Sequence, residues 1–214
     1  MATSDRELGP DDVLAAVAAS QQVLGAALDR DWEAQAGTLD WTCRRTLDHL
    51  IDGTVFYCGQ VANEAPKRLP PIRMGNADAS VEDLVTTIGT VAHILASALR
   101  SAPDGGRFFH PAGMADRSGY AAMSCVELLV HTSDIAAGLG IDFAPPNELC
   151  ERVVRRLFPW IDDMGPDAFA VMRWTTGRIT IDGREDVAAD WYWQCAPLSE
   201  WDGTIKKRPA PPQG

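Results

Sequence analysis

The sequence predicts an all-α protein: a four-helix bundle over residues 1–140, a small α+β extension over residues 141–205 packed on the bundle, and a flexible tail over residues 206–214. Two observations carry this prediction. Four long segments place apolar residues at helical spacing, and capping residues or Gly and Pro bound them. After Pro159 the chain changes to short β-rich and aromatic segments. Because each amphipathic helix must bury one apolar stripe, four in succession favour a bundle.

The first two helices begin at recognisable signals. The first is expected over about residues 11–30, where an Ala- and Leu-rich segment follows Gly9 and Pro10. The second is expected over about residues 42–64, with the Thr42 hydroxyl as N-cap. Its apolar residues recur at helical spacing: Leu47, Leu50, Ile51, Val55 and Phe56. We expect this helix to bury one face in the bundle.

The third and fourth helices have clear limits. The third is expected over about residues 81–100, because Ser80 and Asp83 resemble a capping box. The fourth is expected over about residues 118–137, and glycines that favour a C-terminal cap follow it.

The segment after the bundle is expected to mix helix and strand. A short helix over about residues 147–157 comes first. Residues 171–183 (VMRWTTGRITIDG) are β-rich and end in an Asp-Gly turn signal, and residues 190–195 (DWYWQC) form an aromatic run suited to a second strand. Five tryptophans gather in this part of the chain, and we expect them to anchor the extension or to form a wall for a ligand: Trp160, Trp174, Trp191, Trp193 and Trp201.

Composition and charge restrict the classes of partner. The net charge of −11 would repel nucleic-acid phosphates and anionic lipid, so neither is expected as a partner. The first residues lack the apolar core of a signal peptide, and no apolar run reaches the roughly 18 residues of a membrane span. The five cysteines are scattered without a C-x-x-C pair. This pattern favours reduced thiols in a cytoplasmic protein over disulfides.

The fourth predicted helix holds a carboxylate in an apolar setting. Glu127 lies among Cys125, Val126, Leu128, Leu129 and Val130, so its helix is expected to be largely buried. Burying a lone carboxylate is costly unless a positive charge or hydrogen bonds compensate it. His131 lies one turn further along the same face, so the two side chains can converge on one point.

A third candidate ligand lies on the second predicted helix. His49 stands in an apolar stretch, residues 46–51 (TLDHLI), of a helix that can pack against the fourth. Two histidines and one carboxylate leave open positions on a zinc-like ion, which is the catalytic arrangement. The spacing alone leaves other interpretations open. A buried histidine is often a hydrogen-bonded core residue, and a Glu four residues before a His is often a surface pair.

Two segments resemble a known superfamily. Residues 41–50 (WTCRRTLDHL), with a Trp eight residues before a helical His, resemble the entry to helix two of the DinB superfamily. Residues 126–134 (VELLVHTSD) resemble its E-x-x-x-H-x-x-D segment. Within it, residues 11–140 most resemble the N-terminal domain family of mycothiol-dependent maleylpyruvate isomerases. This resemblance implies a DinB-like four-helix bundle whose zinc ligands, a His, a Glu and a His, fall on His49, Glu127 and His131.

The resemblance also implies chemistry at the metal. A divalent ion would activate a low-molecular-weight thiol such as mycothiol, which would then be transferred to a small-molecule substrate or assist its isomerisation. Zn²⁺ is the first candidate, and Ni²⁺ or another divalent ion is the alternative. The isomerases carry a longer C-terminal domain that contributes a catalytic arginine. The extension here is short, and Arg173, Arg178 and Arg184 do not align clearly with that arginine. Isomerase activity itself is therefore not carried over.

Two other classes of function stay open. The same ion could activate water and make the protein a hydrolase of a small molecule. The fold could also serve a non-enzymatic metal-binding or stress-response protein. For each class we expect a monomer or a homodimer.

Two further residues are candidate catalytic groups. Asp134, three residues after His131, could orient the ring of that ligand or act as a base; the alternative is an exposed polar residue near the helix end. His110 lies in residues 108–113 (FFHPAG), before the metal helix. It could reach over the site as a general acid or base, and the alternative is a structural role in its loop.

Overall fold

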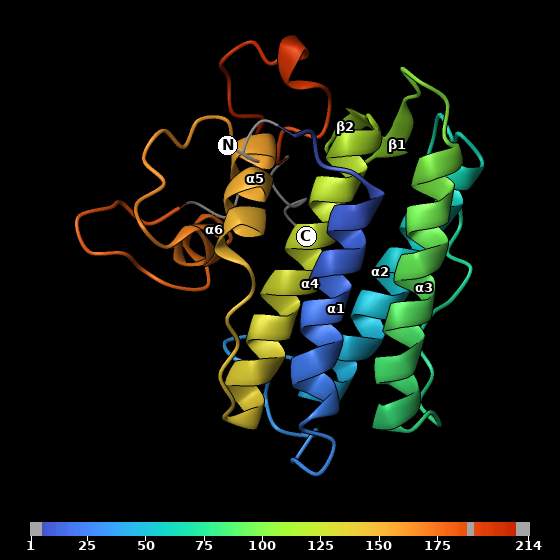
Figure 1. The fold of residues 1–214 in the computed structure, drawn as a ribbon, viewed down its shortest axis with the longest axis vertical. Helices are drawn as coiled ribbons and strands as arrows, with labels where there is room; N and C mark the ends of the chain where they lie inside the picture. Colours follow the sequence, from blue (N-terminus) through green and yellow to red (C-terminus); the bar gives the residue numbers. More distant parts are fainter. Residues whose placement is uncertain (1–5, 188–190, 209–214) are drawn as a thin grey trace, which may run out of the picture.

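Four long helices, a short hairpin and a smaller helical part make up the computed structural model, which describes residues 6–187 and 191–208. The bundle helices are α1 (Pro10–Gly25), α2 (Cys43–Ala62), α3 (Val81–Ser101) and α4 (Arg117–Leu139). The hairpin strands are β1 (Phe108–His110) and β2 (Gly113–Ala115), and the extension holds α5 (Asn147–Leu157), α6 (Ala168–Thr175) and a 3₁₀ turn (Leu198–Glu200). Figure 1 shows α5 and α6 on the α4 side of the bundle, away from α3. The predicted all-α class, a helical bundle followed by a small extension, is confirmed.

The bundle helices follow one another around the core in the order α1, α3, α2, α4. Both α1 and α2 pack against α3 and α4. The connection over residues 63–80 explains this order. Near the end of α2 the Gln60 side chain accepts the Leu69 N–H, and later in the connection Arg73 forms an ion pair with Asp48 in the second turn of α2. The connection therefore runs back along α2, so α2 and α3 point in the same direction (Figure 1).

The helix limits follow the capping signals of the sequence. The Thr42 hydroxyl caps α2, and the Ser80 hydroxyl caps α3. At the end of α4, Gly140 has a φ of 65°, the left-handed conformation that glycine adopts without strain. The exception is α1, which ends at Gly25. The chain continues as turns over residues 26–30, the rest of the range predicted for this helix.

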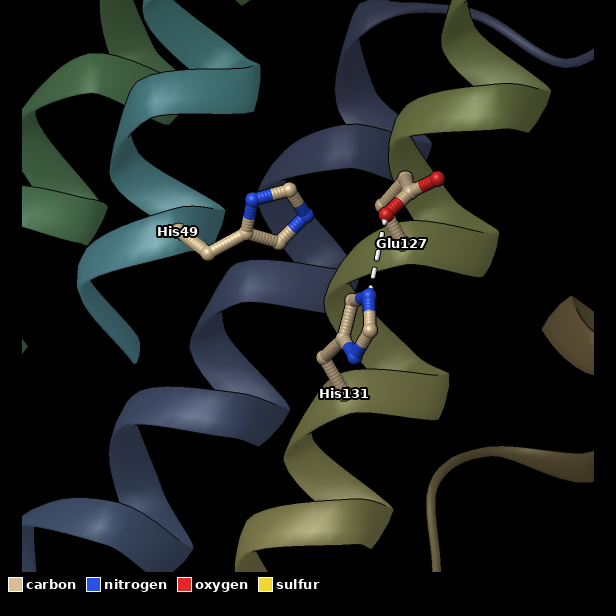
Figure 2. Close-up of side chains that lie close together, drawn as sticks. All are labelled: His49, Glu127 and His131. Atoms are coloured by element: carbon tan, nitrogen blue, oxygen red, sulfur yellow. Dashed lines mark ion pairs between the residues drawn. The ribbon is translucent and has the colours of Figure 1, made fainter. Parts of the chain in front are cut away.

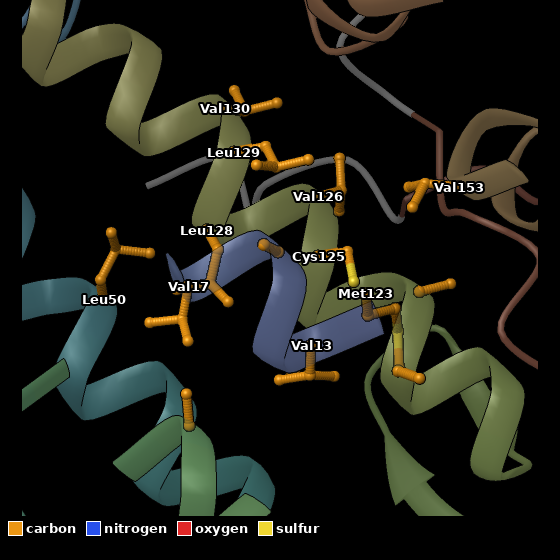
Figure 3. Close-up of a cluster of buried hydrophobic side chains, with 14 of the residues drawn as sticks. Val13, Val17, Leu50, Met123, Cys125, Val126, Leu128, Leu129, Val130 and Val153 are labelled. Carbon is orange, nitrogen blue, oxygen red and sulfur yellow. The ribbon is translucent and has the colours of Figure 1, made fainter. Parts of the chain in front are cut away.

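The core around α4 is apolar (Figure 3). Side chains of α1, α2, α4 and α5 join in one buried cluster, which includes Val13, Val17, Leu50, Met123, Cys125, Val126, Leu128, Leu129, Val130 and Val153. Each such side chain contributes roughly 1.5–3 kcal/mol when it leaves water. Because three helices cover α4, most of its circumference is buried, as its sequence predicts.

One described helix, α3, has the length and apolar content of a membrane span. Half of its most apolar window (50%) is buried, and its buried face packs against α1 and α2. A core helix of a bundle has the same composition.

The first strand predicted for the extension, within residues 171–183, is wrong. Its start belongs to α6, whose N-cap Asp167 accepts the N–H of Ala170 at 2.9 Å. The buried residues of α6 recur at helical spacing: Ala168, Phe169, Val171, Met172, Trp174 and Thr175. Because this spacing begins before Val171, a window starting at Val171 shows only the β-branched and aromatic half of the pattern.

The second predicted strand is reduced to one bridge. Residue 190 lies outside the described residues, and Trp191 forms an isolated bridge with Lys207. Tyr192 N–H donates to the Lys206 carbonyl at 2.8 Å, and Arg208 Nε donates to the Trp191 carbonyl at 3.0 Å. Residues 206–208, predicted to begin a flexible tail, are thus hydrogen-bonded, and residues 209–214 of that prediction lie outside the described residues.

Three arginines of the extension form ion pairs with aspartates of the bundle. All six side chains are at most 22% exposed. We call them the three arginine bridges: Arg152–Asp12 at 2.5 Å, Arg156–Asp116 at 2.6 Å and Arg178–Asp134 at 3.2 Å.

Candidate metal centre

Two bundle helices bring three possible metal ligands together. His49 comes from α2, and Glu127 and His131 come from α4; Figure 2 shows the three side chains converging. One ligand atom of each lies within 4.8 Å of the other two. His131 Nε2 is 3.3 Å from Glu127 Oε2, and the rings of His49 and His131 lie 5.4 Å apart at 88°. The structure therefore places together the three residues that the sequence selected.

Local packing explains why these side chains meet. The neighbours of Glu127 along α4 are buried in the core, which sets the rotation of the helix and leaves Glu127 and His131 on its half-buried face. On α2, Leu50 and Ile51 are buried in the same core, so the preceding residue, His49, is turned toward the edge of the core. Trp41, just before α2, lies against the His49 ring at 4.8 Å between centroids. This contact gives a physical reason for the Trp-to-His spacing in the sequence.

A second carboxylate orients His131. His131 Nδ1 is 3.0 Å from Asp134 Oδ2, so Nδ1–H donates to Asp134 and Nε2 faces Glu127. Arg178, from the extension, donates to both oxygens of Asp134, at 3.3 Å from Nε and 3.2 Å from Nη2. A carboxylate on the far nitrogen of a histidine is the usual support of a metal-bound imidazole, because it selects the tautomer that leaves the other nitrogen free for the ion.

The electrostatics of the site favour a positive charge between the ligands. Burial lowers the pKa of His49. Burial acts in the same direction on His131, but hydrogen bonds to Asp134 and Glu127 outweigh it and raise the pKa of His131 to about 9. Burial would raise the pKa of Glu127, yet His131, His49 and Arg178 hold that pKa below its ordinary value. Glu127 is therefore ionised at neutral pH, and the protonated His131 ring balances its charge at the position beside it that a metal ion would take.

The donor set fits a divalent metal ion. Ligands about 2.0–2.2 Å from a tetrahedral zinc ion stand roughly 3.3 Å from one another. The separation of His131 Nε2 and Glu127 Oε2, 3.3 Å, already has this value. The His49 nitrogen lies within 4.8 Å of both of these atoms, so all three residues can be neighbours of one ion.

A cavity of about 280 Å³ is lined by two of the three candidate ligands, Glu127 and His131. The α4 residues Val126, Val130, Glu127 and His131 form one wall. The other walls come from the extension and include Thr176, Arg178, Val187, Trp191, Trp193 and Arg208. A small molecule in this cavity would lie beside Glu127 and His131.

The structure does not bring His110 to the three ligands. His110 ends β1, where its Nδ1 accepts the Ala112 N–H at 3.1 Å and its Nε2 lies 3.5 Å from the Tyr57 hydroxyl. Burial lowers the pKa of His110 to about 4, so the ring is neutral at pH 7. Its ring packs against Trp193, at 5.9 Å between centroids, and among the described residues Trp193 and not His110 lines the cavity. A catalytic role for His110 stays a prediction.

The extension contributes residues that the sequence did not select. Arg178 does not align clearly with the arginine of the isomerases, and no spacing pattern links it to Asp134. The aromatic run did carry a signal, since a ligand wall was one of its two interpretations. Trp193 serves both, because it lines the cavity and packs against His110 of the β1 strand at 5.9 Å between centroids.

Fold and site together define a DinB-like four-helix bundle with a His–Glu–His candidate metal centre. The family model of the mycothiol maleylpyruvate isomerase N-terminal domain matches residues 13–136, more than half of the chain, and the chain belongs to this family. No curated protein sequence matches the chain.

A solved structure shares the fold beyond the bundle. It is the crystal structure of a variant of mycothiol-dependent maleylpyruvate isomerase, with a TM-score of 0.56 and 13% identity, covering 84% of this chain and 93% of that chain. A match over 84% of 214 residues extends past residues 1–140, so part of the extension is shared too. We expected the isomerase to have a longer C-terminal part than this chain, but the match covers 93% of the solved chain and leaves little of it uncovered.

Proposed function

We propose that the protein is a metal-dependent enzyme that uses a low-molecular-weight thiol of the mycothiol type. It would either transfer the thiol to a small molecule or use the thiol to isomerise that molecule. The observation that carries this proposal is the convergence of His49, Glu127 and His131 beside a cavity. Three protein ligands leave a divalent ion with open positions, as in catalytic zinc sites. The matched family and the solved structure are both named for mycothiol.

The residues of the chain have distinct parts in this proposal. His49, Glu127 and His131 would hold the ion, with Zn²⁺ as the best fit to two imidazoles and one carboxylate. When bound, such an ion lowers the pKa of a coordinated thiol and so supplies a thiolate at neutral pH. Asp134 holds the proton on His131 Nδ1, and the apolar side chains of Val126 and Val130 keep water from one wall of the cavity.

The cavity favours a small substrate. Its volume, about 280 Å³, is just below the range of roughly 300–1,000 Å³ that is typical of small-molecule sites. Its walls combine apolar side chains with the polar groups of Thr176, Arg178 and Arg208, so a bound molecule would be both packed and oriented.

Elemental analysis tests the metal centre. We expect about one divalent ion per chain after dialysis, and we expect His131→Ala to lose it. His93→Ala is the matched control, because His93 is exposed on α3 and its Nδ1 bonds Gly89 of the same helix at 2.8 Å. The control variant should keep the ion. If His131→Ala bound metal as tightly as the wild type, the proposed centre would be wrong.

A spectroscopic titration tests the thiol. With Co²⁺ in the site, addition of mycothiol should produce a thiolate-to-cobalt charge-transfer band, and S-methylated mycothiol should not. Absence of the band, with turnover of a screened substrate in the absence of any thiol, would instead support the hydrolase. A protein that binds no metal would support a non-enzymatic role.

A further inference from the structure

One of the three arginine bridges differs from the other two in what it contacts. The bridges of Arg152 and Arg156 involve Asp12 and Asp116, which have no contact with the candidate metal ligands among the interactions described here. Asp134, in contrast, accepts a hydrogen bond from His131 at 3.0 Å while it accepts two from Arg178. The extension thus reaches a metal ligand through one carboxylate.

We propose that Arg178 is a positioning residue of the metal centre: it holds the Asp134 carboxylate in the orientation that directs His131 Nε2 toward the ion. The inference rests on the proposed function, since it concerns the same ion. It assigns to the extension a role in metal affinity that goes beyond forming a wall of the cavity.

The contacts around Asp134 leave its carboxylate little freedom. The Asp134 side chain is 3% exposed, and both of its oxygens receive a donor from the planar Arg178 guanidinium. The guanidinium is itself fixed, because Arg178 Nη1 donates to the Thr176 carbonyl at 2.7 Å. On another side, the chain at Gly37 lies against Asp134, close enough that a Cβ on Gly37 would stand 3.5 Å from the Asp134 backbone. The carboxylate plane, and with it the acceptor for His131 Nδ1–H, is therefore set by Arg178.

The charge of Arg178 and its contact with Asp134 predict opposite effects on metal affinity when Arg178 is replaced. A cation near a metal site repels the ion, so loss of the Arg178 charge alone would tighten metal binding. Loss of the bidentate contact would instead free the buried Asp134 carboxylate to rotate away from His131, which would weaken metal binding. Lysine separates the two effects, because it keeps the charge but cannot bond both carboxylate oxygens in the same planar geometry.

The test measures the dissociation constant of Zn²⁺ by competition with a chromophoric chelator. We expect Arg178→Gln and Arg178→Lys each to weaken binding by roughly tenfold or more, the usual effect of losing a group that supports a ligand. Arg184→Gln is the matched control, because Arg184 lies in the same extension but pairs with exposed Asp163 at 3.1 Å; it should change the constant less than about twofold. Unchanged binding in both Arg178 variants, or tighter binding in Arg178→Gln, would overturn the proposal.

A double-mutant cycle tests the route through Asp134. If Arg178 acts through that carboxylate, Arg178→Gln should have little further effect in an Asp134→Asn background. Independent, multiplicative losses would contradict the route. A wild-type protein without metal would refute the proposed function itself, whereas a metal-binding wild type with insensitive Arg178 variants would refute only the positioning role.

Discussion

The bundle and the C-terminal extension are held in place by different interactions. Most contacts between the bundle helices are apolar, as in the cluster around Leu128 and Val17 (Figure 3), and the ion pair between Asp11 and Arg100 is exposed. The extension also buries apolar residues of α5, but it adds the three arginine bridges, each from an extension arginine to a bundle aspartate.

This difference has consequences for stability and for function. Apolar burial has no charge dependence and grows with area, whereas a buried ion pair is costly to form and costly to break. An ion pair also has direction, so it can place one element at a defined angle on another. The candidate metal centre combines both kinds of contact, because packing sets the helix faces and the Arg178 bridge contacts both oxygens of Asp134.

The largest expected effect on stability comes from breaking a bridge. Arg156→Met should lower the free energy of unfolding by about 3–5 kcal/mol, because Asp116 and the Gln194 carbonyl would lose a buried partner. Arg155→Met is the matched control, because Arg155 is half exposed and pairs with Glu151 on the surface. Loss of the Arg155 charge should cost less than about 1 kcal/mol. Urea unfolding of both variants checks this. Equal losses would mean that the bridge does not attach the extension.

A core truncation in the bundle should have a somewhat smaller effect. Leu128→Ala removes a fully buried side chain and should cost roughly 3 kcal/mol, with no dependence on pH. Ile94→Ala, on the exposed face of α3, should stay within about 0.5 kcal/mol. The measurement is urea unfolding at pH 7 and pH 5. A pH-dependent loss in Leu128→Ala would show that the two regions are not held as differently as we infer.

The pH dependence of the Asp12 bridge is the smallest of the three effects. Burial would raise the pKa of Asp12, but hydrogen bonds from Arg152 and Gly9 and the charges of Arg152 and Arg6 lower it below its ordinary value. A lowered pKa stabilises the fold above the unfolded-state pKa of about 3.9, and this contribution is lost as pH falls through the folded-state pKa.

We therefore expect the stability difference between the wild type and Asp12→Asn to narrow as the pH falls below about 4. Asp11→Asn is the control, since Asp11 is exposed and pairs with exposed Arg100. Its free energy of unfolding should follow the wild type throughout. A constant difference between the wild type and Asp12→Asn would contradict the lowered pKa.

Much of the fold was predictable because the signals are local. Thr42, Ser80 and Gly140 mark helix ends through hydrogen bonds and backbone conformations within a few residues, and the structure places the ends there. The strand predicted at residues 171–183 failed because β-branched residues outweighed a helical spacing that begins earlier, at the Asp167 cap. The hairpin of β1 and β2 carried no comparable signal, since its strands are three residues long.

The candidate ligands were predictable for a related reason. Glu127 and His131 lie one turn apart on one helix, so their convergence depends on helix geometry alone. His49 needed the resemblance to a known superfamily, because its approach to α4 depends on how two helices pack. For His110 the sequence left two roles open, reaching over the site or a structural role in its loop, and in the structure its ring contacts Tyr57 and Trp193.

The sequence by itself determined four long helices, the carboxylate and imidazole on one face of the fourth, and the family to which the bundle belongs. Only the tertiary structure decided which residues of the extension reach that face: Arg178 on Asp134, and Trp191 and Trp193 on the cavity wall. Helical spacing and capping act over a few residues and can be read along the chain. The contact between Asp134 and Arg178, 44 positions apart, depends on how α5, α6 and the loops around them pack against α4.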